Sequence, residues 1–195
     1  ARRIADPDSP VDLALVQGGI PLSPEDGVEA LATVFLEPLF VFHADALEDV
    51  TFPPTWQDLR IAVGAQGSGT RFAFGRMAEL MSLNLQVNEL VPVGGMQAAR
   101  ALLDGEVDVA VFVAPPSAPY LAPLFASEEV RMTEILHAEA LARQMPYVER
   151  VPVPDHGIDY RRERPPREVS LLALSARLVA RETLHPAAVN RLIRA

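Results

Sequence analysis

The chain has 195 residues, of which 49% are hydrophobic, so it is long and apolar enough for one large domain or two small ones and is not intrinsically disordered. Its 17 basic and 26 acidic residues give a net charge of -9, which disfavours nucleic acid and acidic membranes as partners. There is no cysteine, which excludes a disulfide framework, a thiolate metal site and a cysteine nucleophile.

The first part of the chain predicts strands joined by turns. A polar lead-in to Pro10, in which we expect no helix, precedes a short buried strand at Val11 to Val16 that ends at two glycines. Val28 to Ala32 predicts a short helix, and Thr33 to His43 an edge or bent strand, because the proline within it cannot donate a ladder hydrogen bond. Asp49 to Pro54 is interpreted as a connection.

The middle of the chain predicts a βαβαβ unit. Thr55 is expected to cap the single turn Trp56 to Leu59 before this unit begins. The unit then consists of strand Arg60 to Val63, helix Gly69 to Leu83, strand Glu89 to Val93, helix Met96 to Leu103 and strand Val107 to Val113. The last strand is almost continuously apolar, which is typical of a parallel strand covered by helices on both faces.

The remaining segments predict a looser order of elements. We expect a helix at Tyr120 to Phe125, a strand at Val130 to Ile135, a helix at Ala138 to Gln144, irregular chain from Pro146 to Pro166, a central strand at Val169 to Ala180 and a last helix starting at Pro186.

A glycine-rich turn at the start of the first predicted helix is the most informative segment. Gly67, Ser68, Gly69 and Thr70 stand where helix amides lack internal partners and the helix dipole is positive, which suits an anion. The alternative is that Ser68 or Thr70 only caps the helix and the glycines only close the turn. The side chain of Arg71 is expected to point away from the helix start.

Standard catalytic and metal motifs fit this sequence poorly. Thr70 and Arg71 replace the Lys-Ser/Thr pair of a P-loop, Gln66 breaks the Gly-x-Ser-x-Gly pattern around Ser68, and Phe72 stands where a dinucleotide fingerprint needs glycine. The four histidines are far apart in the sequence, without a partner at metal-ligand spacing. We therefore expect no catalytic residue, no metal and no cofactor.

An ordered set of motifs resembles the TAXI family of TRAP-type solute receptors over nearly the whole chain. The set comprises Gln17-Gly18 after the first strand, Leu36 to Phe42, Trp56 to Arg71 and Ala101 to Ala114. The Gly-Ser-Gly-Thr turn alone also recurs in other anion receptors, including phosphate-binding proteins. The resemblance implies an α/β, two-lobed type 2 periplasmic-binding-protein fold.

The resemblance also implies how the chain is organised. Residues 1–47 and 129–195 would form lobe I, which is discontinuous, and residues 48–128 would form lobe II. The family's first strand and helix have no counterpart before Ala1, so lobe I is expected to be incomplete in this fragment. Some full-length members carry a carboxy-terminal segment and a membrane anchor, which implies a periplasmic or membrane-anchored extracytoplasmic protein.

A ligand site between the lobes is a further implication of the resemblance. The expected ligand-binding residues are Gln17, Gly18, Phe35, Gly67, Ser68, Gly69, Thr70, Ala114 and Pro115. Known ligands of the family are carboxylates such as glutamate, and a membrane transporter subunit is the expected partner. Two departures, Gln17-Gly18-Gly19 and Gly94-Gly95, leave the identity of the ligand open.

Three functional classes remain from the sequence. The first is a receptor for a small carboxylate, either an amino acid or a dicarboxylate, and its variant is a receptor for an inorganic oxyanion such as phosphate. The second is an enzyme on the same fold, for which Ser68 lacks a nearby base. The third is the effector domain of a regulator, for which the sequence contains no DNA-binding helix pair.

Overall fold

A computed structural model describes residues 2–47 and 56–194 of the chain. The predicted connection Asp49 to Pro54 and the predicted cap Thr55 lie outside the described residues. The strands are β1 (Leu13–Gln17), β2 (Val28–Ala44), β3 (Arg60–Ala62), β4 (Glu89–Val91), β5 (Val109–Val113), β6 (Val130–Met132), β7 (Val148–Val153) and β8 (Val169–Arg181). The helices are α1 (Arg2–Ala5), α2 (Gly69–Leu80), α3 (Gly95–Leu103), α4 (Ala122–Ala126), α5 (Ala138–Gln144) and α6 (Pro186–Ile193), with 3-10 turns at Pro24–Asp26 and Leu85–Val87.

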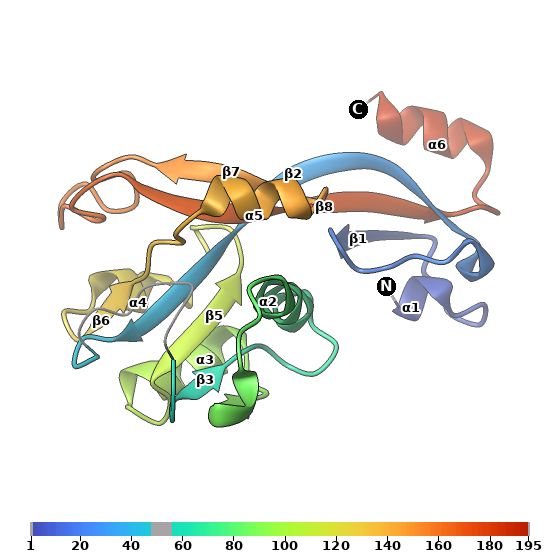
Figure 1. Cartoon of the computed structure of the whole chain (residues 1–195). Coiled ribbons are helices and arrows are strands. Elements are labelled where there is room, and N and C mark those ends of the chain that lie inside the picture. The colour runs from blue at the N-terminus through green and yellow to red at the C-terminus, as the bar shows by residue number, and fades with distance from the viewer. Residues whose placement is uncertain (1, 48–55, 195) are drawn as a thin grey trace.

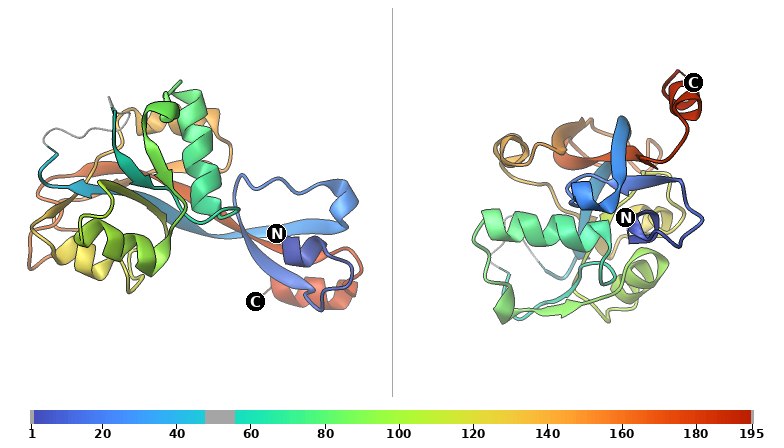
Figure 2. Two further views of the ribbon diagram at one scale, coloured as in Figure 1. Left: turned by 90° about the horizontal axis from the view of Figure 1, so that it is seen from below. Right: turned by 90° about the vertical axis from the view of Figure 1, so that its right-hand side faces the viewer.

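The described strands form one mixed sheet in the order β1-β8-β2-β5-β3-β4, with β6 paired to β2 and β7 paired to β8. Strand β3 pairs in parallel with both β4 and β5, whereas β2 runs antiparallel to β5 and to β8. The predicted βαβαβ unit is therefore confirmed, and the antiparallel strands β2 and β8 extend its sheet. These two long strands run from the end that carries α2, α3 and α4 to the end that carries β1, α1 and α6 (Figures 1 and 2).

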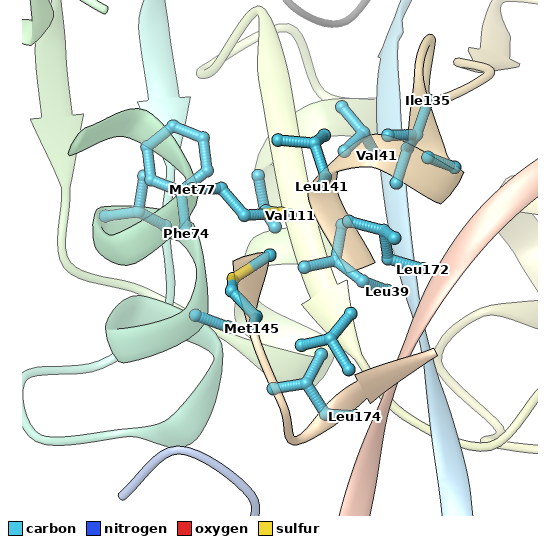
Figure 3. Close-up of a cluster of buried hydrophobic side chains, with 14 of the residues drawn as sticks. Leu39, Val41, Phe74, Met77, Val111, Ile135, Leu141, Met145, Leu172 and Leu174 are labelled. Atoms are coloured by element: carbon cyan, nitrogen blue, oxygen red, sulfur yellow. The ribbon is translucent and has the colours of Figure 1, made fainter. Parts of the chain in front are cut away.

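Two hydrophobic clusters lie on opposite faces of the sheet. On one face, Val109 and Val111 of β5 pack with Phe74 and Met77 of α2 and with Leu141 of α5. Figure 3 shows this cluster, in which α2 and α5 meet over β2, β5 and β8. On the other face, Ala110 and Phe112 of β5 pack against α3 and α4. This α/β/α layering explains why β5 is apolar at successive positions.

The first cluster combines side chains from both predicted lobes. Leu39 and Met145, from the expected lobe I, pack in the same cluster as Phe74 and Met77, from the expected lobe II. A third and smaller cluster, built around Ile4, Val16, Val28 and Val179, lies at the end of the sheet that carries β1. The division at residues 47 and 129 stays a prediction.

Strand β2 differs from its expected form at its start. Val28 to Ala32 is not a helix, because Val28, Glu29 and Ala30 pair with Arg181, Ala180 and Val179 of β8. Five residues give an isolated helix too few hydrogen bonds to compete with such pairing. Register shifts between Ala30 and Ala32 and between Thr33 and Phe35 mark bulges, which bend a strand.

Strand β2 changes its neighbour along its length, so only part of it is an edge. Residues 28–39 pair with β8, and residues 39–43 pair with β5. Pro38 stands at the change of neighbour, where its missing N–H removes no bond to β5. Its carbonyl oxygen accepts a hydrogen bond from the amide of Ala114 at 3.2 Å.

Two further segments expected to lack regular structure contain an element. The polar lead-in holds the single turn α1, anchored by Ile4, which is 1% exposed. The proline-rich stretch from Pro146 to Pro166 holds β7, which pairs with β8 from Val148 opposite Leu174 to Val153 opposite Val169. Among the described strands β7 pairs only with β8, so Pro152 is tolerated there as on other edge strands.

The start of β3 is held by an ion pair that predicts acid-sensitive stability. Asp108 accepts hydrogen bonds from Arg60 at the backbone amide (2.7 Å), Nε (3.0 Å) and Nη2 (2.7 Å). The side-chain hydrogen bond from Arg60, followed by the one from its backbone amide, lowers the pKa of Asp108 from its ordinary value of 3.8. The ionised form is therefore more favoured in the folded state than in the unfolded state.

We expect Asp108→Asn to lower the free energy of unfolding by about 1 kcal/mol at neutral pH, a modest value because the pair is partly solvated. A depressed folded-state pKa contributes stability above the unfolded pKa, and this contribution is lost as the pH falls through the folded pKa. The difference between the two proteins in urea titrations should thus shrink below pH 4. A difference that stays constant down to pH 2 would exclude the charge as its origin.

Candidate functional site

The carboxyl ends of the parallel strands meet at one place. The amide of Gly64, after β3, donates to the carbonyl oxygen of Val93, after β4, at 2.9 Å. A Cβ atom at Gly94 would lie 3.3 Å from the Cα of Gly64, so the two loops touch through glycine backbones. In open α/β sheets, ligands bind beyond the carboxyl ends of the strands, in the crevice where connections diverge.

Helix α2 begins at this crevice. Ser68 is its N-cap, and its Oγ accepts a hydrogen bond from the amide of Arg71 at 3.2 Å. Within the described parts of the chain, the amides of Gly69 and Thr70 donate to no protein acceptor. The helix start thus has a side-chain cap and free amides at the same time. The free amides lie at the end of the helix where the dipole favours an anion.

Thr70, Ala114 and Pro115, three of the predicted site residues, take part in hydrogen bonds with the backbone near the helix start. The Oγ1 of Thr70 accepts a hydrogen bond from the amide of Val113 at 3.3 Å, which leaves its hydroxyl hydrogen for another acceptor. Ala114 is 1% exposed and its amide is engaged by Pro38, while the carbonyl oxygen of Pro115 accepts from Ala118 at 2.9 Å. Ala114 thus lies behind the crevice rather than on its surface, and Pro115 is exposed.

Gln17 bridges the end of β1 and the start of α2. A Cβ atom at Gly69 would lie only 1.5 Å from the Oε1 of Gln17, so this oxygen rests directly against the Gly69 backbone. The Nε2 of Gln17 donates to the Oε2 of Glu37 at 2.9 Å. Gln17 and the glycine-rich helix start are thus in direct contact, whereas a ligand between them stays a prediction.

Gly18 and Gly19 occupy crowded positions next to Gln17. The amide of Gly18 donates to the carbonyl oxygen of Ser175 at 2.6 Å, and a Cβ atom there would be 2.8 Å from that same oxygen. Gly19 has a φ of 85°, and a Cβ atom there would be 2.4 Å from the ring of Tyr147. These glycines allow close packing beside the helix start, whereas ligand contact by Gly18 stays a prediction.

Phe35 lies on the same face of the sheet as Gln17. Both residues are register partners of Ala176 in β8, one from β2 and the other from β1. Residues directly opposite in neighbouring strands point to the same face, and so does Glu37, two residues along β2. Phe35 is 41% exposed, so its ring is available on this face.

An open pocket of about 630 Å³ lies against the helix start. It is lined by Arg3, Ile20, Gln66, Gly67, Ser68, Arg71 and Phe72. The Nη1 of Arg71 is buried without a hydrogen-bond partner among the described residues. The direction expected for the Arg71 side chain stays a prediction, and Arg71 and Arg3 both line the pocket beside the helix start.

The sequence analysis missed several residues of this region. Glu37 lies within the apolar strand expected at Thr33 to His43 and was assigned no role, although a charged residue inside such a strand is itself a signal of function. Arg3 and Ile20 come from segments without a motif, and only the fold brings them to α2. Burial raises the pKa of Glu37, and the hydrogen bond from Gln17 opposes this shift.

No described helix is long and apolar enough to cross a membrane. The described residues also contain no group of three or more histidine, aspartate or glutamate side chains placed to hold a metal ion.

Solved structures share this architecture at low sequence identity. The regulatory domain of CcmR from Synechocystis PCC6803, in complex with 2-PG, matches with a TM-score of 0.57 and 13% identity over 99% of this chain and 76% of that one. The effector-binding domain of QuiR, in complex with shikimate, matches with a TM-score of 0.55 and 11% identity over 94% of this chain and 68% of that one. The substrate-binding protein AbpA from Streptococcus pneumoniae, bound to L-arginine, matches with a TM-score of 0.52 and 12% identity over 99% of this chain and 64% of that one.

These similarities define the fold as that of a type 2 periplasmic-binding protein, which confirms the predicted fold class. The chain spans less than two thirds of AbpA. It belongs to the NMT1-like family, whose model matches residues 24–195. No curated protein matches the sequence.

Proposed function

We propose that this chain is a solute-binding receptor that captures a small carboxylate at the start of α2. The observation that carries the proposal is the coincidence of free helix amides, the unpartnered Nη1 of Arg71 and an open pocket at the carboxyl ends of parallel strands. A carboxylate accepts hydrogen bonds from such amides and forms a bidentate pair with a guanidinium. The pocket has the volume usual for a small-molecule site.

The biological setting is part of the same proposal. The motif order of the sequence favours a TAXI-type receptor that passes its solute to a TRAP-type membrane transporter or reports it to a sensing system. We place the receptor on the extracytoplasmic side of the membrane, as that class requires. The fold also serves regulatory domains, so this setting depends on the motifs and not on the fold.

Binding rather than catalysis is supported by the side chains around the helix start. The hydroxyl of Ser68 accepts from the amide of Arg71 as a helix cap, and no histidine lines the pocket beside it. A nucleophilic serine needs a base within hydrogen-bonding reach. An inorganic oxyanion remains the second candidate ligand, because the same amides and arginines would bind phosphate.

The test is the binding of acetate, succinate, L-aspartate, L-glutamate, phosphate and sulfate to the purified protein by calorimetry. We expect at least one carboxylate to bind, and Arg71→Ala to weaken that binding by about tenfold or more, since loss of a charge-assisted hydrogen bond costs about 1.5–3 kcal/mol. Arg76→Ala is the matched control on the same helix, because Arg76 is exposed and pairs with Glu79.

Other outcomes would redirect the proposal. Tighter binding of phosphate than of every carboxylate would favour the oxyanion receptor. Disappearance of a bound carboxylate over time, abolished by Ser68→Ala, would move the protein to the enzyme class. If none of these compounds binds, the proposal that this chain is a receptor for them is wrong.

A further inference from the structure

We infer that Glu37 makes this receptor selective for amino acids over dicarboxylates, by binding the ammonium group of a ligand whose carboxylate lies at the α2 start. This inference rests on the proposed function and adds the chemical class of the ligand. It depends on the position of one carboxylate that neither the motif order nor the fold assigns to the site.

Glu37 is held close to the helix start by a single side chain. The amide group of Gln17 touches the Gly69 backbone through Oε1 and donates to Glu37 through Nε2 at 2.9 Å. The amide group of Gln17 thus fills the space between Glu37 and the helix start, and a ligand that reaches both would take its place. In an α-amino acid the carboxylate and the ammonium are attached to the same carbon, so their separation is about the length of one amide group.

The charge of Glu37 is not neutralised by the protein. The ion pairs formed by the described residues do not include it, and its hydrogen-bond partner is the uncharged amide of Gln17. Burial, followed by the charge of Glu37, raises the pKa of Tyr120. A partly buried carboxylate without a cationic partner is costly unless a ligand supplies the cation.

The location of Glu37 keeps it free for a ligand. It lies in β2 next to Pro38, just before the strand begins to pair with β5, and it is only partly buried. Phe35 and Gln17 lie on the same face, which places an aromatic ring beside the carboxylate. This face thus offers an anion-binding helix start, a cation-binding carboxylate and an apolar surface.

The same carboxylate would act against dicarboxylates. A second negative group on the ligand, placed near Glu37, is repelled, because like charges close together in a partly desolvated site weaken binding. Specificity of this kind combines an attraction for one ligand with a repulsion of its competitor.

The experiment compares ligands that differ only in the ammonium group. Calorimetry with L-aspartate against succinate, and with L-glutamate against glutarate, should show at least tenfold tighter binding of the amino acid in each pair to the wild-type protein. In Glu37→Gln this preference should fall to threefold or less, because the amide cannot neutralise an ammonium, while binding of the dicarboxylates is retained or improved.

Two variants control the interpretation. Glu29→Gln removes an exposed glutamate from the same strand and should leave the preference unchanged. Glu37→Asp keeps the charge and should keep at least part of the preference for the amino acid. This variant tests the role of the charge if Glu37→Gln is too unstable for calorimetry.

The failure of this inference differs from the failure of the proposed function. Equal binding of both members of each pair to the wild-type protein, or an unchanged preference in Glu37→Gln, overturns the role of Glu37 and leaves a carboxylate receptor. If no member of either pair binds, the receptor function and the role of Glu37 both fall.

Discussion

Phe42→Ala is expected to lower the free energy of unfolding by about 3–5 kcal/mol, the usual cost of removing a buried phenyl ring. Phe42 is 1% exposed, and its ring lies 6.0 Å from that of Phe112 and 5.3 Å from that of Phe125, measured between centroids. It belongs to the part of β2 that pairs with β5 and with β6, so removal of the ring weakens the packing where these three strands meet.

The matched control is Phe35→Ala on the same strand. Phe35 is 41% exposed, and we expect its truncation to change the free energy of unfolding by less than about 1 kcal/mol. Urea titrations followed by circular dichroism measure both variants. A Phe42→Ala protein with a midpoint within error of the wild type would mean that the aromatic cluster of this face does not hold β2.

Gly69→Ala is expected to weaken carboxylate binding by at least tenfold with little loss of stability. The new Cβ atom would lie 1.5 Å from the Oε1 and 2.5 Å from the Cδ of Gln17. These atoms end a flexible side chain, so Gln17 can swing away, but it then loses its hydrogen bond to Glu37. The methyl group would also stand beside the free amides of the helix start.

Gly75→Ala in the same helix separates this effect from a general change in α2. No atom lies within 4 Å of a Cβ built at Gly75, and alanine stabilises a helix interior by about 1 kcal/mol relative to glycine. We expect a slightly higher melting temperature and unchanged binding of L-aspartate and succinate in this variant. If Gly69→Ala binds these compounds as tightly as Gly75→Ala does, the site is not at the start of α2.

The two predictions address different parts of one arrangement. The stability of β2 comes from buried rings on the face covered by α3 and α4. The proposed ligand residues Gln17, Phe35 and Glu37 lie where β2 and β8 continue past β5 towards β1. The long paired strands β2 and β8 connect these two parts of the molecule (Figure 2).

Patterns within the sequence were sufficient to predict the βαβαβ unit and the glycine-rich helix start. Both depend on local signals: apolar runs of strand length, helical periodicity, and a serine cap followed by glycine. The helix began at Gly69 with Ser68 as its cap, as expected, because these residues can satisfy one another without distant partners. The motif order from Gln17 to Ala114 was also sufficient to predict the fold class, although the helix expected at Val28 was wrong.

Elements and side chains that depend on distant partners could be placed only once the chain was seen folded. Strand β7 forms within a proline-rich stretch because β8 offers it a ladder, and the first residues of β2 are extended for the same reason. Arg71 lines one pocket with Arg3 and Ile20, which are distant from it in the sequence. Glu37 meets Gln17 across twenty residues of sequence, since both strands pair with β8, and no pattern within either segment carries that information.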